Sequence, residues 1–198
     1  MKVYNSHEIK NIALLGNDGS GKTTLTESLL FESGLIKKRG RITQKNTVSD
    51  YFPVEQDYGY SVFSTVFHTE WNGKKLNIID CPGSDDFVGA ALTALNVTDT
   101  AVLLLNGRFG PEVGTQNHFR YTEKLKKPVI FLVNQLDSDA CDYDGIIEQL
   151  QMNYGSKAIP VQYPVATGPG FNSLIDIILM KMLVFKEEGG EPELCDIP

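Results

Sequence analysis

The chain has 198 residues, of which 41% are hydrophobic, 22% are charged and 10% are aromatic. A chain of this length buries enough surface to fold without disulfide or metal cross-links, and its composition excludes the disordered and fibrous classes. The formal net charge of −7 excludes the broad basic surface of a free-standing DNA-binding protein, so we expect no DNA partner. A local basic patch can still contact a large RNA–protein assembly.

Cysteines and apolar runs indicate a cytoplasmic protein with no membrane partner. The three cysteines are an odd number without C-x-x-C spacing: Cys81, Cys141 and Cys195. This pattern is typical of reduced thiols in the cytosol rather than of a disulfide framework. We expect no signal peptide at the N-terminus. The longest apolar run, 174–185, is interrupted by two charges and is too short to span a bilayer.

Short apolar runs alternate along the chain with segments of helical period. The apolar runs predict strands at Ile9–Leu15, Val62–Trp71, Lys75–Asp80, Ala101–Leu105 and Val129–Val133. The dipeptide Asn72-Gly73 predicts a hairpin turn between the second and third strands. Helices are expected at Thr23–Phe31, Phe87–Leu95, Glu112–Lys126 and Tyr143–Asn153. This order predicts an α/β fold, a doubly wound, mostly parallel sheet with helices on both faces.

Two parts of the chain do not follow the alternation. Leu35–Tyr60 shows no clear period and is expected as a long functional loop. Near the end of the chain, Val161–Val165 is expected to be extended and Thr167–Gly170 breaks the chain. The period of Leu174–Phe185 does not distinguish a helix from a strand, and Glu187–Glu191 is a turn signal.

The most specific motif is G-x-x-x-x-G-K-[ST], placed between the first strand and the first helix. It comprises Gly16, Asn17, Asp18, Gly19, Ser20, Gly21, Lys22 and Thr23, and Thr24 follows it. Its glycines let backbone N–H groups turn toward phosphate oxygens, and the helix N-terminus adds positive potential. We expect Lys22 to contact the β- and γ-phosphates and the Thr23 hydroxyl to bind Mg²⁺.

Two further motifs follow in the order typical of GTPases. The first, D-C-P-G, ends a predicted strand; Asp80 would hold Mg²⁺ through water, and the Gly83 N–H would meet the γ-phosphate. The second, N-Q-L-D, ends a later strand and supplies Asn134, Gln135 and Asp137. The Asp137 carboxylate can accept from both N–H groups of guanine but faces the wrong polarity on adenine. The motifs therefore predict GTP/GDP and Mg²⁺ as ligands, with a P-loop kinase or ATPase as the alternative.

These motifs resemble the GTPase domain of elongation factor G and its relatives, including the tetracycline-resistance ribosomal protection proteins. The resembling stretches are IKNIALLG at 9–16, GKTTLTESLLFESG at 21–34, NIIDCPGSDDFV at 77–88, VTDTAVLLLNGRFGPEVGTQ at 97–116 and PVIFLVNQLD at 128–137. A further stretch, VQYPVATGPGFNSLIDIILMKM at 161–182, resembles the start of the subdomain inserted in elongation factor G, which favours that factor over the resistance proteins. The resemblance implies a P-loop NTPase fold and a ribosomal partner of rRNA and ribosomal proteins. We expect a monomer.

The resemblance also implies where the domains divide. Residues 1–163 would form the GTP-binding domain, and residues 164–198 would begin the inserted subdomain. In the family, a final strand, an S-A-K/L guanine loop and a last helix follow that insert. The chain has no Ser-Ala pair, and Ala166-Thr167 is only a superficial candidate. We therefore expect a fragment of a longer protein, truncated before its last strand.

Departures from the family touch the chemistry of hydrolysis and the binding of the base. Ser61 stands where the family has a Mg²⁺-binding threonine and keeps the hydroxyl, so it is a third candidate metal residue. Beside Gly83, Ser84 replaces a histidine that positions the attacking water, a loss that typically costs about 10²–10⁴ in rate. These two are the candidate catalytic positions. Gln135 replaces the lysine that packs on the base.

The resemblance implies a ribosomal translocation factor that binds GTP, and the departures predict that it hydrolyses GTP weakly. The alternatives are an ordinary hydrolysing translational GTPase, a ribosomal protection protein, and a factor that binds GTP without consuming it. His68 or His118 could supply the missing imidazole, although packing and surface roles are commoner. Lys37–Arg39 and Arg41 form a basic cluster, which is either solvated surface or a contact for RNA phosphates.

Overall fold

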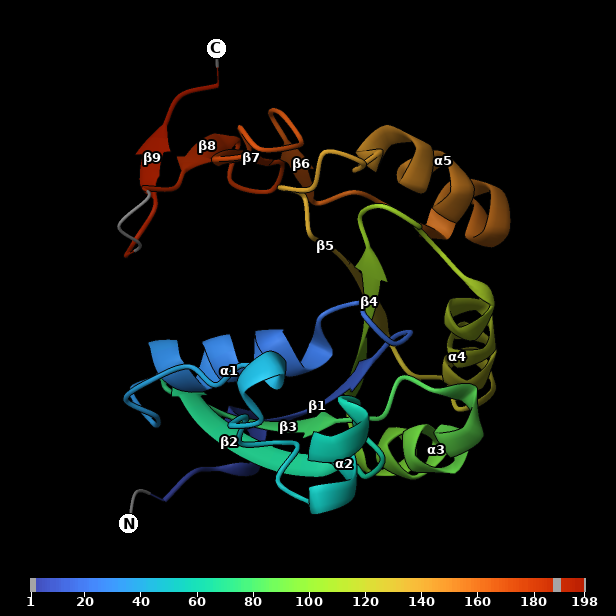
Figure 1. The fold of residues 1–198 in the computed structure, drawn as a ribbon. Coiled ribbons are helices and arrows are strands. Elements are labelled where there is room, and N and C mark those ends of the chain that lie inside the picture. Colours follow the sequence, from blue (N-terminus) through green and yellow to red (C-terminus); the bar gives the residue numbers. More distant parts are fainter. Residues whose placement is uncertain (1–2, 187–189, 198) are drawn as a thin grey trace. The chain divides into compact units, whose positions relative to one another are not determined.

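The computed structural model describes residues 3–186 and 190–197. The chain divides into two compact units, one of residues 1–105 with 112–132 and one of residues 106–111 with 133–198. The first unit holds most of a five-stranded sheet, and the second holds a smaller antiparallel sheet (Figure 1). Within the described residues, no helix has both the length and the hydrophobicity required to cross a membrane.

The larger sheet has the strand order β2-β3-β1-β4-β5. The strands are β1 Ile9–Leu15, β2 Thr65–Trp71, β3 Lys74–Asp80, β4 Thr100–Asn106 and β5 Val129–Asn134. Strand β1 pairs in parallel with both β3 and β4. The predicted hairpin is confirmed, because β2 runs antiparallel to β3 across Asn72 and Gly73, which both have positive φ. Since β1 lies between β3 and β4, its carboxyl end is the topological switch point at which such sheets bind ligands.

Helices cover both faces of this sheet, as the sequence predicts. In the first unit the helices are α1 Lys22–Glu32, α2 Pro53–Tyr58, α3 Val88–Val97 and α4 Val113–Lys124. The helix α5, Tyr143–Tyr154, belongs to the second unit. Alternate residues of β1 point to opposite faces. Leu14 packs in a cluster with Leu25 and Leu29 of α1, whereas Ala13 and Leu15 pack in a cluster with α3 and α4. The fold is therefore a doubly wound α/β sandwich.

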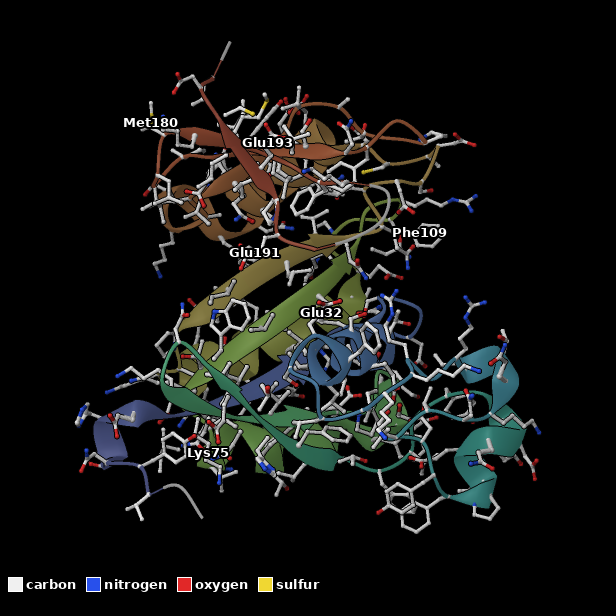
Figure 2. All side chains as sticks on the ribbon, turned by 90° about the vertical axis from the view of Figure 1, so that its left-hand side faces the viewer. Glu32, Lys75, Phe109, Met180, Glu191 and Glu193 are labelled. Carbon is white, nitrogen blue, oxygen red and sulfur yellow. The ribbon has the colours of Figure 1, made fainter. Side chains whose placement is uncertain are left out.

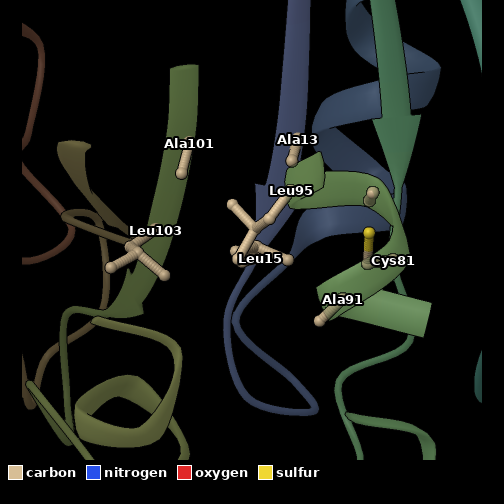
Figure 3. Packing of buried hydrophobic residues seen from close by; sticks show 8 residues of the cluster. Ala13, Leu15, Cys81, Ala91, Leu95, Ala101 and Leu103 are labelled. Carbon is tan, nitrogen blue, oxygen red and sulfur yellow. The ribbon is translucent and has the colours of Figure 1, made fainter. Parts of the chain in front are cut away.

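The larger core cluster lies between the sheet and α3 (Figure 3). Its buried members are Ala13, Leu15, Cys81, Ala91, Ala94, Leu95, Ala101 and Leu103. The alanines let α3 approach the strands closely, and the leucines fill the layer between them. Each fully buried leucine contributes about 1.5–3 kcal/mol of transfer free energy. Burial also raises the pKa of the Cys81 thiol to about 12, so this cysteine serves as a small apolar residue.

The smaller sheet is antiparallel and has the order β6-β7-β8-β9. Its strands are β6 Gln162–Pro164, β7 Ser173–Asp176, β8 Lys181–Val184 and β9 Glu193–Cys195. The ambiguous apolar run thus forms β7 and β8. Between them, the Asp176 carboxylate accepts from the N–H groups of Ile178 and Leu179 at 3.0 and 2.8 Å. The sheet begins at Gln162, two residues before the expected domain boundary. The predicted turn at 187–191 falls mainly outside the described residues.

The expectation of one long loop at 35–60 is wrong in part. The segment contains the short helix α2 and a 3₁₀ turn, Ile42–Gln44. Pro53 occupies the first helical position and Gly59 ends the helix with φ 74°, which are ordinary helix boundary signals. At six residues the helix is too short to show a hydrophobic period, so periodicity could not reveal it.

Candidate functional site

The phosphate loop connects β1 to α1 at the switch point of the sheet. At Gly16, φ is 142°, and a Cβ placed there would lie 2.4 Å from the Leu104 carbonyl oxygen of β4. Any side chain would therefore push the loop off the end of the neighbouring strand. Helix α1 starts at Lys22, directly after the loop, so its first unpaired N–H groups face the loop.

Lys22 turns back into the loop that precedes it. Its Nζ donates to the carbonyl oxygens of Gly16 at 2.8 Å and Asn17 at 3.0 Å, and the residue is only 6% exposed. Burial lowers the pKa of Lys22, and the negative charges of Asp80 and Asp18 oppose that shift. An ammonium has three donors, so two carbonyls leave one N–H for a further acceptor. The residue can thus offer positive charge to an anion at the loop.

Asp80 ends β3 and is 2% exposed. Neither of its carboxylate oxygens accepts a hydrogen bond of ordinary geometry among the described residues, although the nearby Thr26 and Thr23 hydroxyls lower its pKa. Burial raises the pKa of Asp80 to about 7, although the positive charge of Lys22 opposes the rise. A buried carboxylate without hydrogen bonds is costly unless a cation accompanies it. The Asp80 carboxylate is therefore well suited to bind a cation.

Hydroxyl groups and a second carboxylate lie in the same region. The Ser61 hydroxyl donates to Asp50 Oδ1 at 2.7 Å and lies 3.4 Å from Thr23 Oγ1. Asp50 is 5% exposed, its Oδ2 has no partner among the described residues, and its charge helps raise the pKa of Asp80. These are the oxygen donors that Mg²⁺ prefers. The residues present therefore fit the predicted ion.

Sequence reasoning missed Asp50 because it lies in the segment expected to be one long loop without a clear period. No periodic pattern marks an isolated acid in this stretch before Ser61. The structure brings Asp50, Ser61 and Thr23 together by folding the segment back over the start of α1. A search for acidic residues in the sequence before Ser61 would have found Asp50 only as one of several candidates.

The D-C-P-G motif lies close to the phosphate loop. A Cβ added to Gly83 would fall 2.7 Å from the backbone nitrogen of Asp18, as well as 2.4 Å from Asp18 Oδ1 and 2.6 Å from Lys22 Nζ. Only glycine allows this approach of the two backbones. The neighbouring Ser84 caps a 3₁₀ turn, since its hydroxyl accepts from the Asp86 N–H at 3.3 Å. The serine that replaces the family's histidine is thus engaged in a helix cap.

The predicted base-reading residues follow β5 and belong to the second unit. Asn134 ends the strand, and Gln135 turns the chain with φ 61°. The Gly107 N–H donates to the Asn134 carbonyl at 2.8 Å, and the Gly168 N–H donates to the Leu136 carbonyl at 2.8 Å. The loop that presents Asp137 is therefore held by backbone bonds. The Gly168 N–H belongs to the segment that begins at Ala166, which the sequence offers only as a superficial candidate for the guanine loop. This segment therefore contacts the loop that presents Asp137.

Two buried glutamates hold the segment that follows α1, and no sequence pattern indicates either of them. Glu27 is 1% exposed and accepts from the N–H groups of Gly40 at 2.7 Å and Val48 at 2.5 Å. Glu55 of α2 is also 1% exposed and accepts from the N–H groups of Val62 at 2.9 Å and Phe63 at 3.0 Å. Glu27 thus holds the beginning of the segment 40–63, and Glu55 holds its end, next to Ser61.

The two candidate histidines differ in their surroundings. His68 is exposed on β2, on the hairpin that forms the edge of the sheet. His118 is 4% exposed on α4, and its Nδ1 has no partner in the described chain. Burial lowers the pKa of His118 to about 4, with Lys22 lowering it further and Asp85 opposing. The imidazole is therefore neutral at pH 7.

A phosphate loop at the switch point of the sheet and a buried carboxylate at the end of β3 are features of the P-loop class of nucleotide-binding domains. The chain belongs to the elongation factor Tu GTP-binding domain family, which it matches over residues 7–188. Within that family it is an elongation factor G-like translational GTPase domain. Proteins of this family bind guanine nucleotides.

Relatives support the narrower assignment. The chain is 31% identical over 190 residues to an elongation factor G-like protein of Thermotoga maritima, covering 96% of this chain and 27% of the relative. It is 31% identical over 199 residues to elongation factor G of Rhodopseudomonas palustris, and the match covers 100% of this chain and 29% of that relative. It is 33% identical over 178 residues to elongation factor G 1 of Syntrophomonas wolfei, and the match covers 90% of this chain and 26% of that relative.

A solved structure shows the same fold. A crystal structure of a Thermus thermophilus protein matches with a TM-score of 0.88 and 32% sequence identity, covering 96% of this chain and 28% of that chain. The chain therefore spans less than a third of the length of each of these relatives.

Proposed function

We propose that this chain binds GTP and GDP together with Mg²⁺. The observation that carries the proposal is the buried pairing of Lys22, turned into its loop, with Asp80, whose carboxylate accepts no hydrogen bond of ordinary geometry among the described residues. Lys22 would bind phosphate oxygens, while Thr23, Ser61 and Asp80 would hold the ion directly or through water. Bound Mg²⁺ would neutralise negative charge on the phosphates. Asp50 joins this set because its free oxygen belongs to the same cluster.

The guanine base would be selected by the loop that follows β5. Asp137 would accept from the two N–H groups of the guanine edge, and Asn134 would steady the loop. Gln135 has a shorter stem than lysine and no charge, so it would pack less well on the base. We expect that loss to be on the order of 1 kcal/mol in binding.

Hydrolysis in this chain is proposed to be weak. Ser84 supplies a neutral hydroxyl, which is a much weaker base than an imidazole, and one lone pair of its oxygen already accepts from the Asp86 N–H. His118 does not make up for the loss, since a ring with a pKa of about 4 is a weak base at neutral pH. Gly83 would still meet the γ-phosphate through its N–H. The domain would then act as a slow switch.

The partner of the complete protein is proposed to be the ribosome. Two of the relatives are elongation factor G proteins and one is elongation factor G-like, and we extend that role to translocation by a protein that contains this chain. GTP would order the segment around Ser61 and the segment around Gly83, and loss of the γ-phosphate would release them. Ribosomal RNA and ribosomal proteins would then read the ordered surface.

Single-turnover hydrolysis tests the proposal of a slow switch. The protein containing this chain is mixed with labelled GTP and ribosomes, and phosphate release is followed alongside an elongation factor G control. We expect GTP to bind and phosphate to appear at least about 100-fold more slowly than with the control. Release at the control rate would show an ordinary hydrolysing GTPase, and absence of GTP binding would contradict the function itself.

A further inference from the structure

A second pocket lies on the outer side of α1. It has a volume of about 680 Å³ and lies between α1 and the segment 37–44. Figure 1 shows this segment, in lighter blue, running beside the helix. The lining residues that matter for its chemistry are Phe31, Lys37, Lys38, Arg39, Gly40 and Arg41. The volume falls in the range of small-molecule sites.

The pocket concentrates positive charge in an acidic protein. Four of the 18 lysines and arginines fall within residues 37–41, although the chain carries a net charge of −7. Within the described part of the chain, none of these four side chains forms an ion pair. Lys45, by contrast, pairs with Asp57 at 3.1 Å. The one carboxylate that lines the pocket, Glu27, is occupied by the Gly40 and Val48 N–H groups.

The basic side chains are presented by a loop that is held in place. The Arg39 guanidinium lies 5.5 Å from the ring centroid of Phe31, and its Nη1 donates to Ser28 Oγ at 3.5 Å. Gly40 is packed so tightly that an added Cβ would lie 2.5 Å from the Asn46 carbonyl and 2.8 Å from Glu27 Oε2. A loop that is already ordered loses less conformational entropy when it binds a ligand.

We propose that this pocket binds the phosphate groups of a ligand with more than one phosphate, at a site separate from the nucleotide site. Arginine binds phosphate through two parallel N–H donors and lysine through a point charge, and the pocket supplies two of each. Such phosphates occur either as the phosphodiesters of an RNA strand or as a free di- or polyphosphate. The inference does not depend on the proposed GTP function.

Two probes distinguish these sources in the 198-residue chain. Inorganic pyrophosphate and a short single-stranded oligoribonucleotide are titrated separately, with GDP and Mg²⁺ saturating the phosphate loop. The titrations are repeated in a Lys22→Ala background, which disables that loop without any nucleotide. The test variant carries Lys37→Glu and Lys38→Glu. The matched control carries Lys124→Glu and Lys126→Glu, an equal change of charge at exposed positions outside the pocket.

We expect one or both probes to bind, with about a tenfold or larger loss of affinity in the Lys37/Lys38 variant and little change in the control. RNA binding alone would identify a phosphodiester ligand, and pyrophosphate binding alone a free one. Equal losses in the two variants, or binding of neither probe, would overturn the proposal. GDP affinity measured in the same variants reports separately on the nucleotide site.

Discussion

At the residue scale, Lys22 and Asp80 carry opposite charges in one buried region. Each side chain is nearly inaccessible to solvent. Burial lowers the pKa of Lys22 and raises the pKa of Asp80, so in both cases it favours the neutral form. A protein that keeps both residues there gains little stability from them, because desolvating two ions offsets much of their attraction. The proposed ligands would supply the complementary charges, phosphate for Lys22 and a divalent cation for Asp80.

Replacing Asp80 tests the cation assignment. Asp80→Asn should leave GDP binding in EDTA unchanged and remove most of the gain in GDP affinity that Mg²⁺ gives the wild type. The physical reason is that a neutral amide is a far weaker Mg²⁺ ligand than a carboxylate. Isothermal titration with and without Mg²⁺ measures the effect, and exposed Asp57→Asn is the control. Equal Mg²⁺ dependence in Asp80→Asn and the wild type would reject the assignment.

Ser84 offers a direct test of the missing imidazole. Ser84→His should raise the single-turnover rate of GTP hydrolysis on ribosomes by about tenfold or more, since an imidazole can orient the attacking water. Ser84→Ala is the matched control, because it removes the cap to Asp86 without adding a base. A rise in both variants would mean that release of the cap, rather than the imidazole, limits the rate.

His118 predicts a pH dependence of stability. Its pKa is about 4 in the folded chain against an ordinary value of 6.5, so below pH 6.5 the unfolded chain binds a proton that the folded chain refuses. The free energy of unfolding should therefore fall by up to about 1.4 kcal/mol per pH unit between pH 6.5 and 4 from this group. His118→Gln should show a shallower fall in urea denaturation. Identical slopes would contradict the buried neutral ring.

At the element scale, most of the fold follows from local patterns. The strands of the large sheet and the four longer helices were predictable because each has a full period or a buried apolar run. Helix α2 was missed since it is too short for a period, and β7 and β8 were not separated because both faces of the run are apolar. The roles of Asp50, Glu27 and Glu55 could not be predicted from the sequence for another reason. Their partners are backbone N–H groups or hydroxyls distant in the sequence, and composition does not encode such contacts.

The segment 40–63 depends on its two buried glutamates. Glu27→Gln should lose one of the two backbone hydrogen bonds, because an amide has a single acceptor oxygen, at a cost of about 1–3 kcal/mol. Hydrogen exchange should accelerate at residues 40–48 while the core strands keep their protection. Glu32→Gln is the control at the exposed end of the same helix (Figure 2). Unchanged exchange at 40–48 would show that Glu27 does not hold the loop.

At the scale of the whole molecule, the residues proposed to bind phosphate and Mg²⁺ and the loop proposed to read the base belong to different units. Lys22 and Asp80 lie in the first, and Asn134, Gln135 and Asp137 lie in the second. Guanine selectivity should therefore be separable from phosphate affinity. Asp137→Ala should weaken GDP binding by about 100-fold or more and leave weak ADP binding unchanged, since only the guanine edge presents donors to the acid.

The most direct test of the account is a paired titration of the chain with GDP and ADP in the presence of Mg²⁺, followed by calorimetry or by fluorescent analogues. The account predicts that GDP binds at least about 100-fold more tightly than ADP and that Lys22→Ala abolishes GDP binding. Equal affinities for the two nucleotides, or GDP binding that survives Lys22→Ala, would contradict it.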